Sequence, residues 1–422
     1  MMKKSAIIKV LKANKKISDY EITISQRDSR ELFYVLDHLE INRAVKTQVV
    51  TVRVYVADKK TCGSSLVVVT AADDERSFAR KVNKAIIQAR QAKNAYYPLV
   101  NKTINIDEKK PKKFDLNETA MKVAQAVLSA DQYEEGWINS TEIFLSVYEK
   151  EFINSRGVDH HSYNMKLEVE CIPTWSNGKE EFELYKFYES NTINYKEITA
   201  EISEILELAK ARSQAKTLKQ VRLPKDLKVL VKNDMLETIV DNFSGDLSYR
   251  NVYMKQNHYA KNDVLSDNKF SLTMKGECKG CASSLEYDRH GVVLKERKLI
   301  NNGVVKNNYG DIQFGYYLGE KDISGELPVA VIKADGVDYE NEKHLIIETF
   351  SAPQIDEDSG YWGGEVRLAR YFDGQKYIPL SGFSIAGNIY EDIKKVEFSK
   401  QQCLMSHYKG PKYMIFKGLK IS

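Results

Sequence analysis

Glu237 and Asp241 are the first residues whose spacing suggests chemistry. They lie in "VLVKNDMLETIVDNFSGD", residues 229–246, where an apolar run leads into a predicted helix. A helical His-Glu-x-x-x-His would bring two imidazoles and a base to one metal, but this frame reads Leu236-Glu237-x-x-x-Asp241. Leucine binds no metal, and one carboxylate is not a site. The spacing therefore favours a structural role, in which Asp234 is the N-cap and Glu237 reaches back to the cap N–H.

Cysteine and histidine pairs are the next candidates. Cys278 and Cys281 form a C-x-x-C pair in "GECKGCASS", which could supply two metal ligands or a redox dithiol. No second pair and no zinc-type His spacing accompanies it, so two free thiols in a Gly-rich loop are favoured. Cys403 and His407 in "QCLMSHYKG" would share a face only in a helix. For them we favour a buried thiol and a surface imidazole.

The remaining motifs of catalysis are missing from the sequence. His160 and His161 are adjacent, so their side chains diverge on a strand and are predicted to lie on the surface. The sequence has no nucleophile elbow, no Walker A motif and no G-x-G-x-x-G. Residue types and spacing alone thus indicate no complete catalytic constellation.

Bulk composition indicates a globular protein of ordinary balance. The 422 residues carry a net charge of +4, which predicts neither a nucleic-acid nor an acidic-membrane partner. The five sparse cysteines fit a reducing compartment, so we expect a cytoplasmic protein. Lys9 and Lys12 interrupt the apolar start, which favours an amphipathic surface helix over a secretory signal.

Hydrophobic periodicity predicts the elements that must position these residues. "VVTVRVYVA" at 49–57 alternates as a half-buried strand, and a second strand returns over 64–70. A helix capped by Asp73 or Asp74 follows, with one apolar stripe. The stripe consists of Phe78, Val82, Ala85, Ile86 and Ala89. Further helices are predicted over 118–129 and 197–215, and further strands over 141–150, 163–172 and 181–188.

These elements predict an α+β fold with a mixed α/β amino-terminal half and a mainly antiparallel β carboxy-terminal half. We expect an amino-terminal α+β domain over 1–105 and a helix-and-strand region over 106–222 that completes the first half. A β-rich carboxy-terminal domain is expected over 223–422. The charged linker "TINIDEKKPKKFD", residues 103–115, marks the first boundary.

Four stretches, in order along nearly the full length, share the character of one known family. They are "RAVKTQVVTVRVYV" with "RKVNKAIIQARQAKNAYYPLV", then "FINSRGVDHHSYNMKLEVECIPT", then "SGYWGGEVRLARYFDGQKYIPLSGFSIAGNI", and finally "PKYMIFKGLKIS". From about Ala44 to Ser422, the chain resembles the TldD/PmbA family. That family was named for modulation of DNA gyrase and is associated with proteolysis and peptide maturation.

The resemblance carries an expectation about metal. TldD-type members hold zinc with a helical His-Glu-x-x-x-His and a later cysteine, and the Glu is the general base. PmbA- or TldE-type members lack that motif and act beside a TldD-type chain. The motif would fall at Leu236 to Asp241, where only Glu237 is retained. Cys403 lies near the late cysteine in a different context, so no metal ligand is carried over.

The resemblance therefore implies a PmbA/TldE-like, metal-free subunit of a peptide-processing assembly. Such a subunit would bind extended peptides by strand addition, without a cofactor, beside a TldD-type partner or as a homodimer. One alternative is an active metallopeptidase with ligands from Glu237, Asp241, Cys403 and the Cys278/Cys281 pair. Another is a non-enzymatic binding protein acting on a gyrase-type target, although the near-neutral charge argues against direct contact with nucleic acid.

Overall fold

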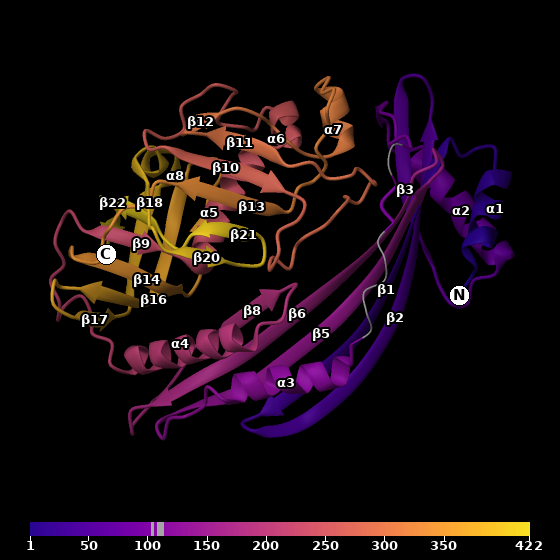
Figure 1. The fold of residues 1–422 in the computed structure, drawn as a ribbon. Coiled ribbons are helices and arrows are strands. Elements are labelled where there is room, and N and C mark those ends of the chain that lie inside the picture. Colours follow the sequence, from indigo (N-terminus) through magenta and orange to yellow (C-terminus); the bar gives the residue numbers. More distant parts are fainter. Residues whose placement is uncertain (103–104, 108–113) are drawn as a thin grey trace.

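The structure, a computed structural model, describes residues 1–102, 105–107 and 114–422. Most of the linker predicted over 103–115 therefore lies outside the described residues. Within the described part of the chain, the strands form three sheets of eight, six and nine strands (Figure 1). The fold is α+β, as the sequence predicts. Strand pairing in the carboxy-terminal half is mainly antiparallel, with parallel pairs between β13 (Val329–Ala334) and β21 (Tyr408–Pro411) and between β9 (Lys228–Val231) and β14 (His344–Phe350).

The amino-terminal sheet has the order β4-β3-β2-β1-β5-β6-β7, with β8 also paired to β6. Four very long antiparallel strands form its body: β1 (Asp19–Val35), β2 (His38–Ala57), β5 (Gly136–Asn154) and β6 (Asp159–Ser176). The shorter strands are β3 (Thr61–Val69), β4 (Asn94–Ala95), β7 (Glu181–Glu183) and β8 (Lys186–Ser190). Together the long strands make one curved band (Figure 1).

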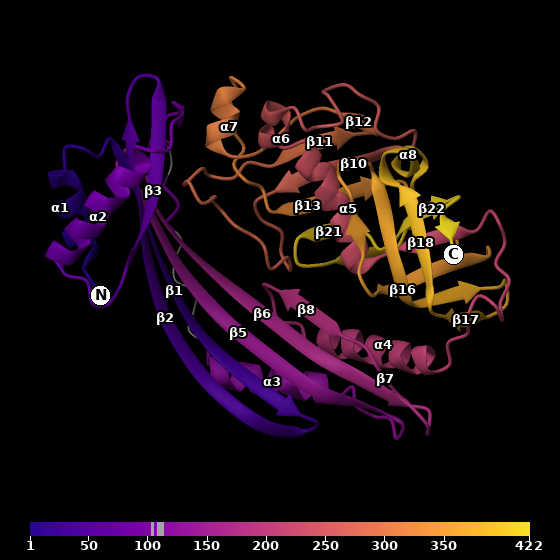
Figure 2. The ribbon, with the colours of Figure 1, turned by 180° about the vertical axis from the view of Figure 1, so that it is seen from behind.

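Four helices pack on one face of this band. They are α1 (Lys4–Ala13), α2 (Glu75–Ala89), α3 (Leu116–Leu128) and α4 (Tyr195–Ser213). The pair α1 and α2 buries the end of the band that includes Ile22 and Val52, and the pair α3 and α4 buries the end that includes Leu32 and Leu167. Seen from behind, α3 lies beyond the long strands, so their other face is turned toward the viewer (Figure 2).

The carboxy-terminal half contains the other two sheets. One has the order β12-β11-β10-β13-β21-β20, and the other β19-β22-β9-β14-β16-β18-β23, with β15 and β17 also on β16. The strands not yet defined are β10 (Phe270–Lys275), β11 (Arg297–Asn301), β12 (Val304–Val305), β15 (Gln354–Ile355), β16 (Tyr361–Phe372), β17 (Tyr377–Leu380), β18 (Phe383–Asn388), β19 (Glu397–Phe398), β20 (Gln402–Leu404), β22 (Met414–Lys417) and β23 (Lys420–Ile421). Helix α5 (Asn233–Asp246) contributes Leu236, Ile239 and Phe243 to the large core that includes residues of both sheets. The smaller helices are α6 (Tyr249–Met254), α7 (Ile312–Tyr317), α8 (Ile389–Asp392) and the 3-10 turn Ile393–Lys395.

The two halves meet along β8 and α4 (Figure 1). Ile205 and Leu208 of α4 join a small apolar cluster with Leu368 of β16. At the other end of the contact, Tyr287 of the loop between β10 and β11 packs against Phe152 of β5. This second contact fixes the position of the loop that carries the C-x-x-C pair.

The sequence predicts the local elements well and the longest strand poorly. Helix α2 has the predicted Asp74 cap, and all five residues of its stripe are buried. By contrast, the sequence pattern does not reveal β1 or the first eleven residues of β2, because charged residues interrupt their apolar alternation. The strand predicted over 181–188 is also wrong in part, since the chain divides there into β7 and β8.

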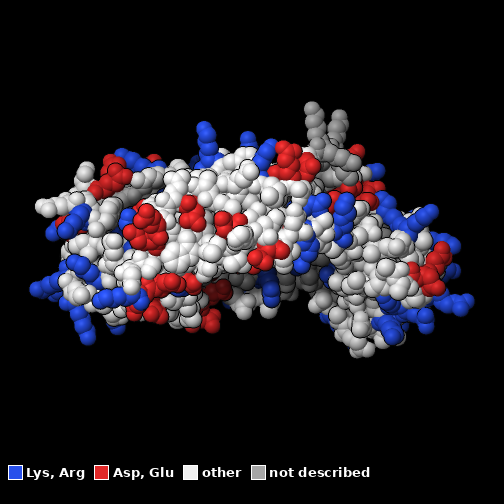
Figure 3. All heavy atoms as spheres, turned by 90° about the horizontal axis from the view of Figure 1, so that it is seen from below, with Lys and Arg blue, Asp and Glu red and all other residues white. Residues whose placement is uncertain are grey.

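Charge is distributed without a dominant sign over the face seen from below. Acidic and basic side chains are interspersed over most of that face, and basic ones gather at the end occupied by α1 and α2 (Figure 3). Among the helices of the described residues, none is both long enough and apolar enough to cross a membrane.

Candidate functional site

The beginning of α5 differs from the predicted capping arrangement. Lys232 is the N-cap in extended backbone, and no side chain caps this end. Asn233 has a φ of 53°, a left-handed conformation that asparagine tolerates, and it turns the chain sharply from β9 into the helix. Asp234 and Glu237 therefore both lie inside the helix. The prediction of Asp234 as cap and Glu237 as its reciprocal partner is wrong, and the Glu237 carboxylate is directed elsewhere.

His407 is the residue that Glu237 meets. It lies in the turn between β20 and β21, with Nδ1 3.3 Å from Oε1 of Glu237 and Nε2 3.1 Å from Oδ2 of Asp241. Glu237 and Asp241 are one helical turn apart, so one imidazole spans both carboxylates. Cys403 and His407 belong to a β-hairpin and not to a helix, and the Cys403 thiol faces the Pro411 carbonyl at 3.8 Å. The His407 side chain is 28% exposed, so the imidazole lies at the surface with part of its ring covered.

The cluster is electrostatically asymmetric. Burial raises the pKa of Glu237 to about 7, against the opposing effect of His407. The hydrogen bond to Asp241 raises the pKa of His407 despite partial burial. No described residue gives Oε1 of Glu237 a well-aligned hydrogen bond, so its contact with His407 is an ion-pair distance only. Asp241 is thus the main partner of the His407 ring, and Glu237 is a carboxyl that can gain or lose a proton near neutral pH.

The residues present do not fit the zinc that the resemblance implies. Leu236 is fully buried in the core, so the first ligand position points away from the cluster. Both ring nitrogens of His407 face carboxylates, which leaves neither free for a metal. In the part of the chain that the structure describes, no three His, Cys, Asp or Glu side chains are grouped to hold a metal ion. No catalytic step through zinc follows from this arrangement.

The three weaker ligand candidates lie beside the cluster. Cys281 is fully buried and directs its thiol to the Tyr408 carbonyl at 3.9 Å, and Cys278 is partly exposed in the same loop. Cys403 lies on the neighbouring strand β20. All three thiols are free, together with those of Cys62 and Cys171. Burial raises the pKa of the Cys403 thiol to about 12, so it is protonated at neutral pH.

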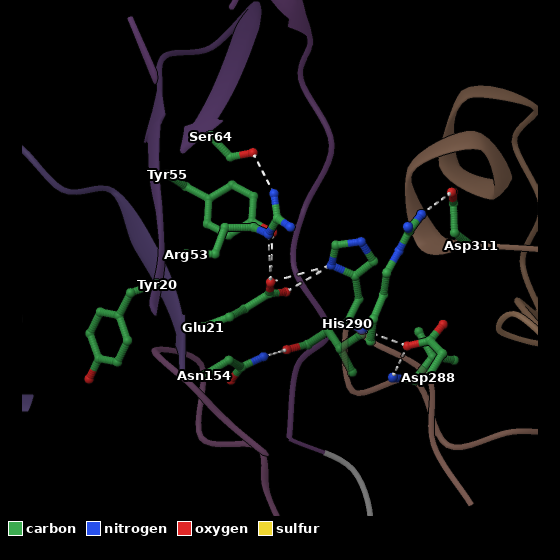
Figure 4. A network of polar contacts seen from close by, with 12 residues as sticks. Tyr20, Glu21, Arg53, Tyr55, Ser64, Asn154, Asp288, His290 and Asp311 are labelled. Carbon is green, nitrogen blue, oxygen red and sulfur yellow. Dashed lines mark hydrogen bonds and ion pairs between the residues drawn. The ribbon is translucent and has the colours of Figure 1, made fainter. Parts of the chain in front are cut away.

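A second buried cluster joins the two halves and was not indicated by any sequence motif. Glu21 of β1 is 4% exposed, and its Oε2 accepts a hydrogen bond of 2.8 Å from the Tyr55 hydroxyl. Nδ1 of His290, in the loop of the carboxy-terminal half, lies 3.2 Å from Oε1 of Glu21, and Nε of Arg53 lies 3.8 Å from Oε2 (Figure 4). A buried carboxylate thus has partners from both halves.

Asp288 shapes the turn that presents His290. Its buried carboxylate accepts the backbone N–H groups of His290 at 2.8 Å and of Val292 at 3.0 Å. His160 bonds to the same turn, with Nε2 3.0 Å from the Gly291 carbonyl and Nδ1 accepting from the Ile106 N–H. His160 is 1% exposed, so its predicted surface position is wrong. The reason is a tertiary partner that lies 131 residues away in the chain.

We expect Glu237→Gln to change stability in a pH-dependent way. Because burial raises the pKa of Glu237 from 4.5 to about 7, the folded state binds more protons than the unfolded state between these pH values. Stability from the protonated carboxyl is therefore lost as pH rises through that range. Glutamine stays neutral, so the variant should gain free energy of unfolding relative to wild type as pH rises. After allowance for coupling to His407, this gain should be about 2 kcal/mol larger at pH 8 than at pH 5, as measured by chemical denaturation.

Glu180→Gln is the matched control, because Glu180 is an exposed carboxylate between β6 and β7, outside the Glu237 cluster. Its difference from wild type should be the same at both pH values. An equal effect of Glu237→Gln at pH 5 and pH 8 would contradict the assigned environment of Glu237.

We expect His290→Asn to cost more stability at pH 6 than at pH 9. Glu21 and Asp288 raise the pKa of His290 above 6.5, against burial and the nearby charge of Arg289. The stabilisation is complete below the unfolded pKa and is lost as pH rises through the higher folded pKa. Thermal unfolding at both pH values tests this, with His38→Asn as control because the His38 side chain is 84% exposed. A loss for His290→Asn that is the same at both pH values would contradict the ion pair with Glu21.

Comparisons with known proteins agree with this architecture. The sequence profile of the PmbA/TldA metallopeptidase C-terminal domain matches residues 224–422, whereas no curated protein sequence matches the chain. Crystal structures of TldE from Thermococcus kodakarensis and of a proposed modulator of DNA gyrase from Thermotoga maritima each superpose with a TM-score of 0.81 at 15% identity. Each match covers 99% of this chain. It covers 100% of the Thermococcus chain and 99% of the Thermotoga chain.

A third structure has the same architecture. It is a proposed modulator of DNA gyrase from Bacteroides thetaiotaomicron, with a TM-score of 0.78, 15% identity and coverage of 99% of this chain and 97% of its own. At this identity the three structures establish the fold alone, and the profile match is confined to the carboxy-terminal half. Residues 224–422 therefore belong to the PmbA/TldD metallopeptidase family.

Proposed function

We propose that this chain is a PmbA/TldE-like subunit of a peptide-processing assembly that acts without a metal of its own. The supporting observation is the set of side chains on α5. Leu236 is buried in the core, and His407 occupies the space between Glu237 and Asp241 with both ring nitrogens directed at carboxylates. A zinc peptidase site needs three protein ligands and an open position for water, which this set does not offer.

The partner in this proposal is a TldD-type chain that supplies the metal. One surface suited to a partner or an extended peptide is the outer edge of β2. Residues 38–49 pair with β1 on one side, and the pairing with β3 begins only at Val50. Among the described residues, no strand pairs with this outer edge, and Leu39 and Ile41 are 39% and 49% exposed. The unpaired N–H and C=O groups of an edge strand are a template on which another strand can pair.

The alternatives draw less support. A metallopeptidase with ligands from Glu237, Asp241, Cys403 and the Cys278/Cys281 pair would need three grouped donors, which the described residues do not provide. A gyrase-type target is suggested by the names of two proteins of known structure that are 15% identical to this chain. A likeness at that identity supports only the fold. The free state of all five thiols is consistent with the cytoplasmic location that we propose.

We expect activity to depend on two different chains. The purified chain should leave an unstructured peptide intact, and a TldD-type chain from the same genome should hydrolyse it faster when this chain is present. Size-exclusion chromatography with light scattering should show a mixed complex. The double variant Leu39→Lys with Ile41→Lys should weaken that complex at least tenfold, because lysines on an edge strand oppose strand addition.

Ile87→Lys is the matched control, since Ile87 is 63% exposed on α2, away from the edge. It should leave the complex unchanged. Metal-dependent hydrolysis by this chain alone would overturn the proposed function, and so would failure to associate with any TldD-type chain of the genome.

A further inference from the structure

The loop that carries Cys278 and Cys281 folds into a tight turn with one cysteine at each end. The Cys281 N–H donates to the Cys278 carbonyl at 3.0 Å, and Gly280 has a φ of 92°. The Ser284 hydroxyl lies 2.9 Å from the Cys278 carbonyl and 2.8 Å from the Cys281 carbonyl, and it accepts the Cys278 N–H at 3.0 Å. A turn closed in this way brings its two end residues within the Cα separation that a disulfide requires. The Cys278 thiol faces the Lys279 carbonyl at 3.8 Å, and the Cys281 thiol faces the Tyr408 carbonyl at 3.9 Å.

The two thiols differ in access. Cys278 is partly exposed, and Cys281 is 0% exposed behind it, against the backbone of Tyr408. One accessible and one sheltered sulfur is the arrangement that thiol–disulfide exchange uses. The outer sulfur meets the external disulfide, and the inner one then displaces it.

The loop also contacts both halves of the molecule. The Gly280 N–H donates to Oδ1 of Asn191 at 2.7 Å, and the Ser190 hydroxyl donates to the Gly280 carbonyl at 3.2 Å. On its other side, the Ser283 N–H donates to the Ser406 carbonyl at 3.1 Å, one residue before His407. A change in this turn is thus transmitted to the end of β8 and to the hairpin that holds His407.

We propose that Cys278 and Cys281 form a reversible disulfide by exchange with a small disulfide such as oxidised glutathione. The Cys278 thiolate attacks one glutathione sulfur, which breaks the glutathione S–S bond and releases one glutathione thiolate. The Cys281 thiolate then attacks the Cys278 sulfur, which forms the protein disulfide and releases the second glutathione. The protein dithiol is oxidised, oxidised glutathione is reduced, and the two protein protons pass to the two glutathione thiolates.

Closing this bond rearranges the turn, because a disulfide requires a defined S–S torsion and draws both thiols away from the carbonyls that they face. The contacts with Ser406 and Asn191 then change together. Oxidation therefore alters the junction between the halves next to the Glu237, Asp241 and His407 cluster. This inference rests on the loop geometry and is independent of the proposed function.

The test uses the full chain equilibrated in glutathione buffers of graded redox potential, then quenched with N-ethylmaleimide in denaturant, so that buried thiols also react, and weighed intact. The number of alkylated thiols should fall from five to three at the oxidising end, and reductant should restore five. Peptide mapping should place the bond between Cys278 and Cys281. Cys278→Ser and Cys281→Ser should each abolish it, and Cys403→Ser should retain it as the matched control.

Hydrogen exchange provides the second readout. Oxidation should change exchange over residues 186–191 and 402–411 in the wild type and leave it unchanged in Cys281→Ser. Five alkylated thiols at every potential would overturn the proposal. So would a glutathione adduct on Cys278 that never resolves, or a disulfide that forms without any change in the two segments.

Discussion

A charge that leaves water needs a partner, and this constraint acts where the two halves of the molecule bury charged side chains between them. Lys232 and Glu348 are 4% and 3% exposed, and their charged atoms lie 2.6 Å apart. Glu204 of α4 adds a second carboxylate 3.2 Å from the same ammonium, so the amino-terminal half completes a buried ion pair of the other half. Separating the halves would take Glu204 away from the buried Lys232 ammonium, which favours close packing of α4 against the carboxy-terminal half.

The same constraint shapes the candidate site. Asp241 and Glu237 place two carboxylates on one face of α5, and a cation is needed to balance them. In a zinc peptidase that cation is the metal, whereas here it is the imidazolium of His407 from a distant hairpin. The asymmetry between an exposed Asp241 and a buried Glu237 leaves one carboxyl able to exchange a proton near neutral pH. The site has retained acid–base character and lacks the ligand set for Lewis-acid chemistry.

Patterns in the sequence predict those features of the structure that depend on residues close together in the chain. The apolar stripe and the Asp74 cap of α2 need only neighbours within one helix, and both are as predicted. The cap of α5 was predicted wrongly because a left-handed Asn233 starts the helix earlier than the spacing of Asp234 and Glu237 suggests. His160 and His290 were not recognised because their partners, Gly291 and Glu21, are 131 and 269 residues away. No periodicity within one element carries that information. The resemblance to a family identified the helix of the site, and only the structure brought His407 to it.

The central claim is that His407 takes the place of a metal between the carboxylates of α5. Elemental mass spectrometry tests it most directly, on untagged protein dialysed first against excess zinc and then against metal-free buffer. The account predicts close to zero zinc, iron or other transition metal per chain, and the same result for His407→Ala. Close to one zinc per chain in the wild type, lost in Glu237→Gln, would contradict the account and make Glu237 a metal ligand.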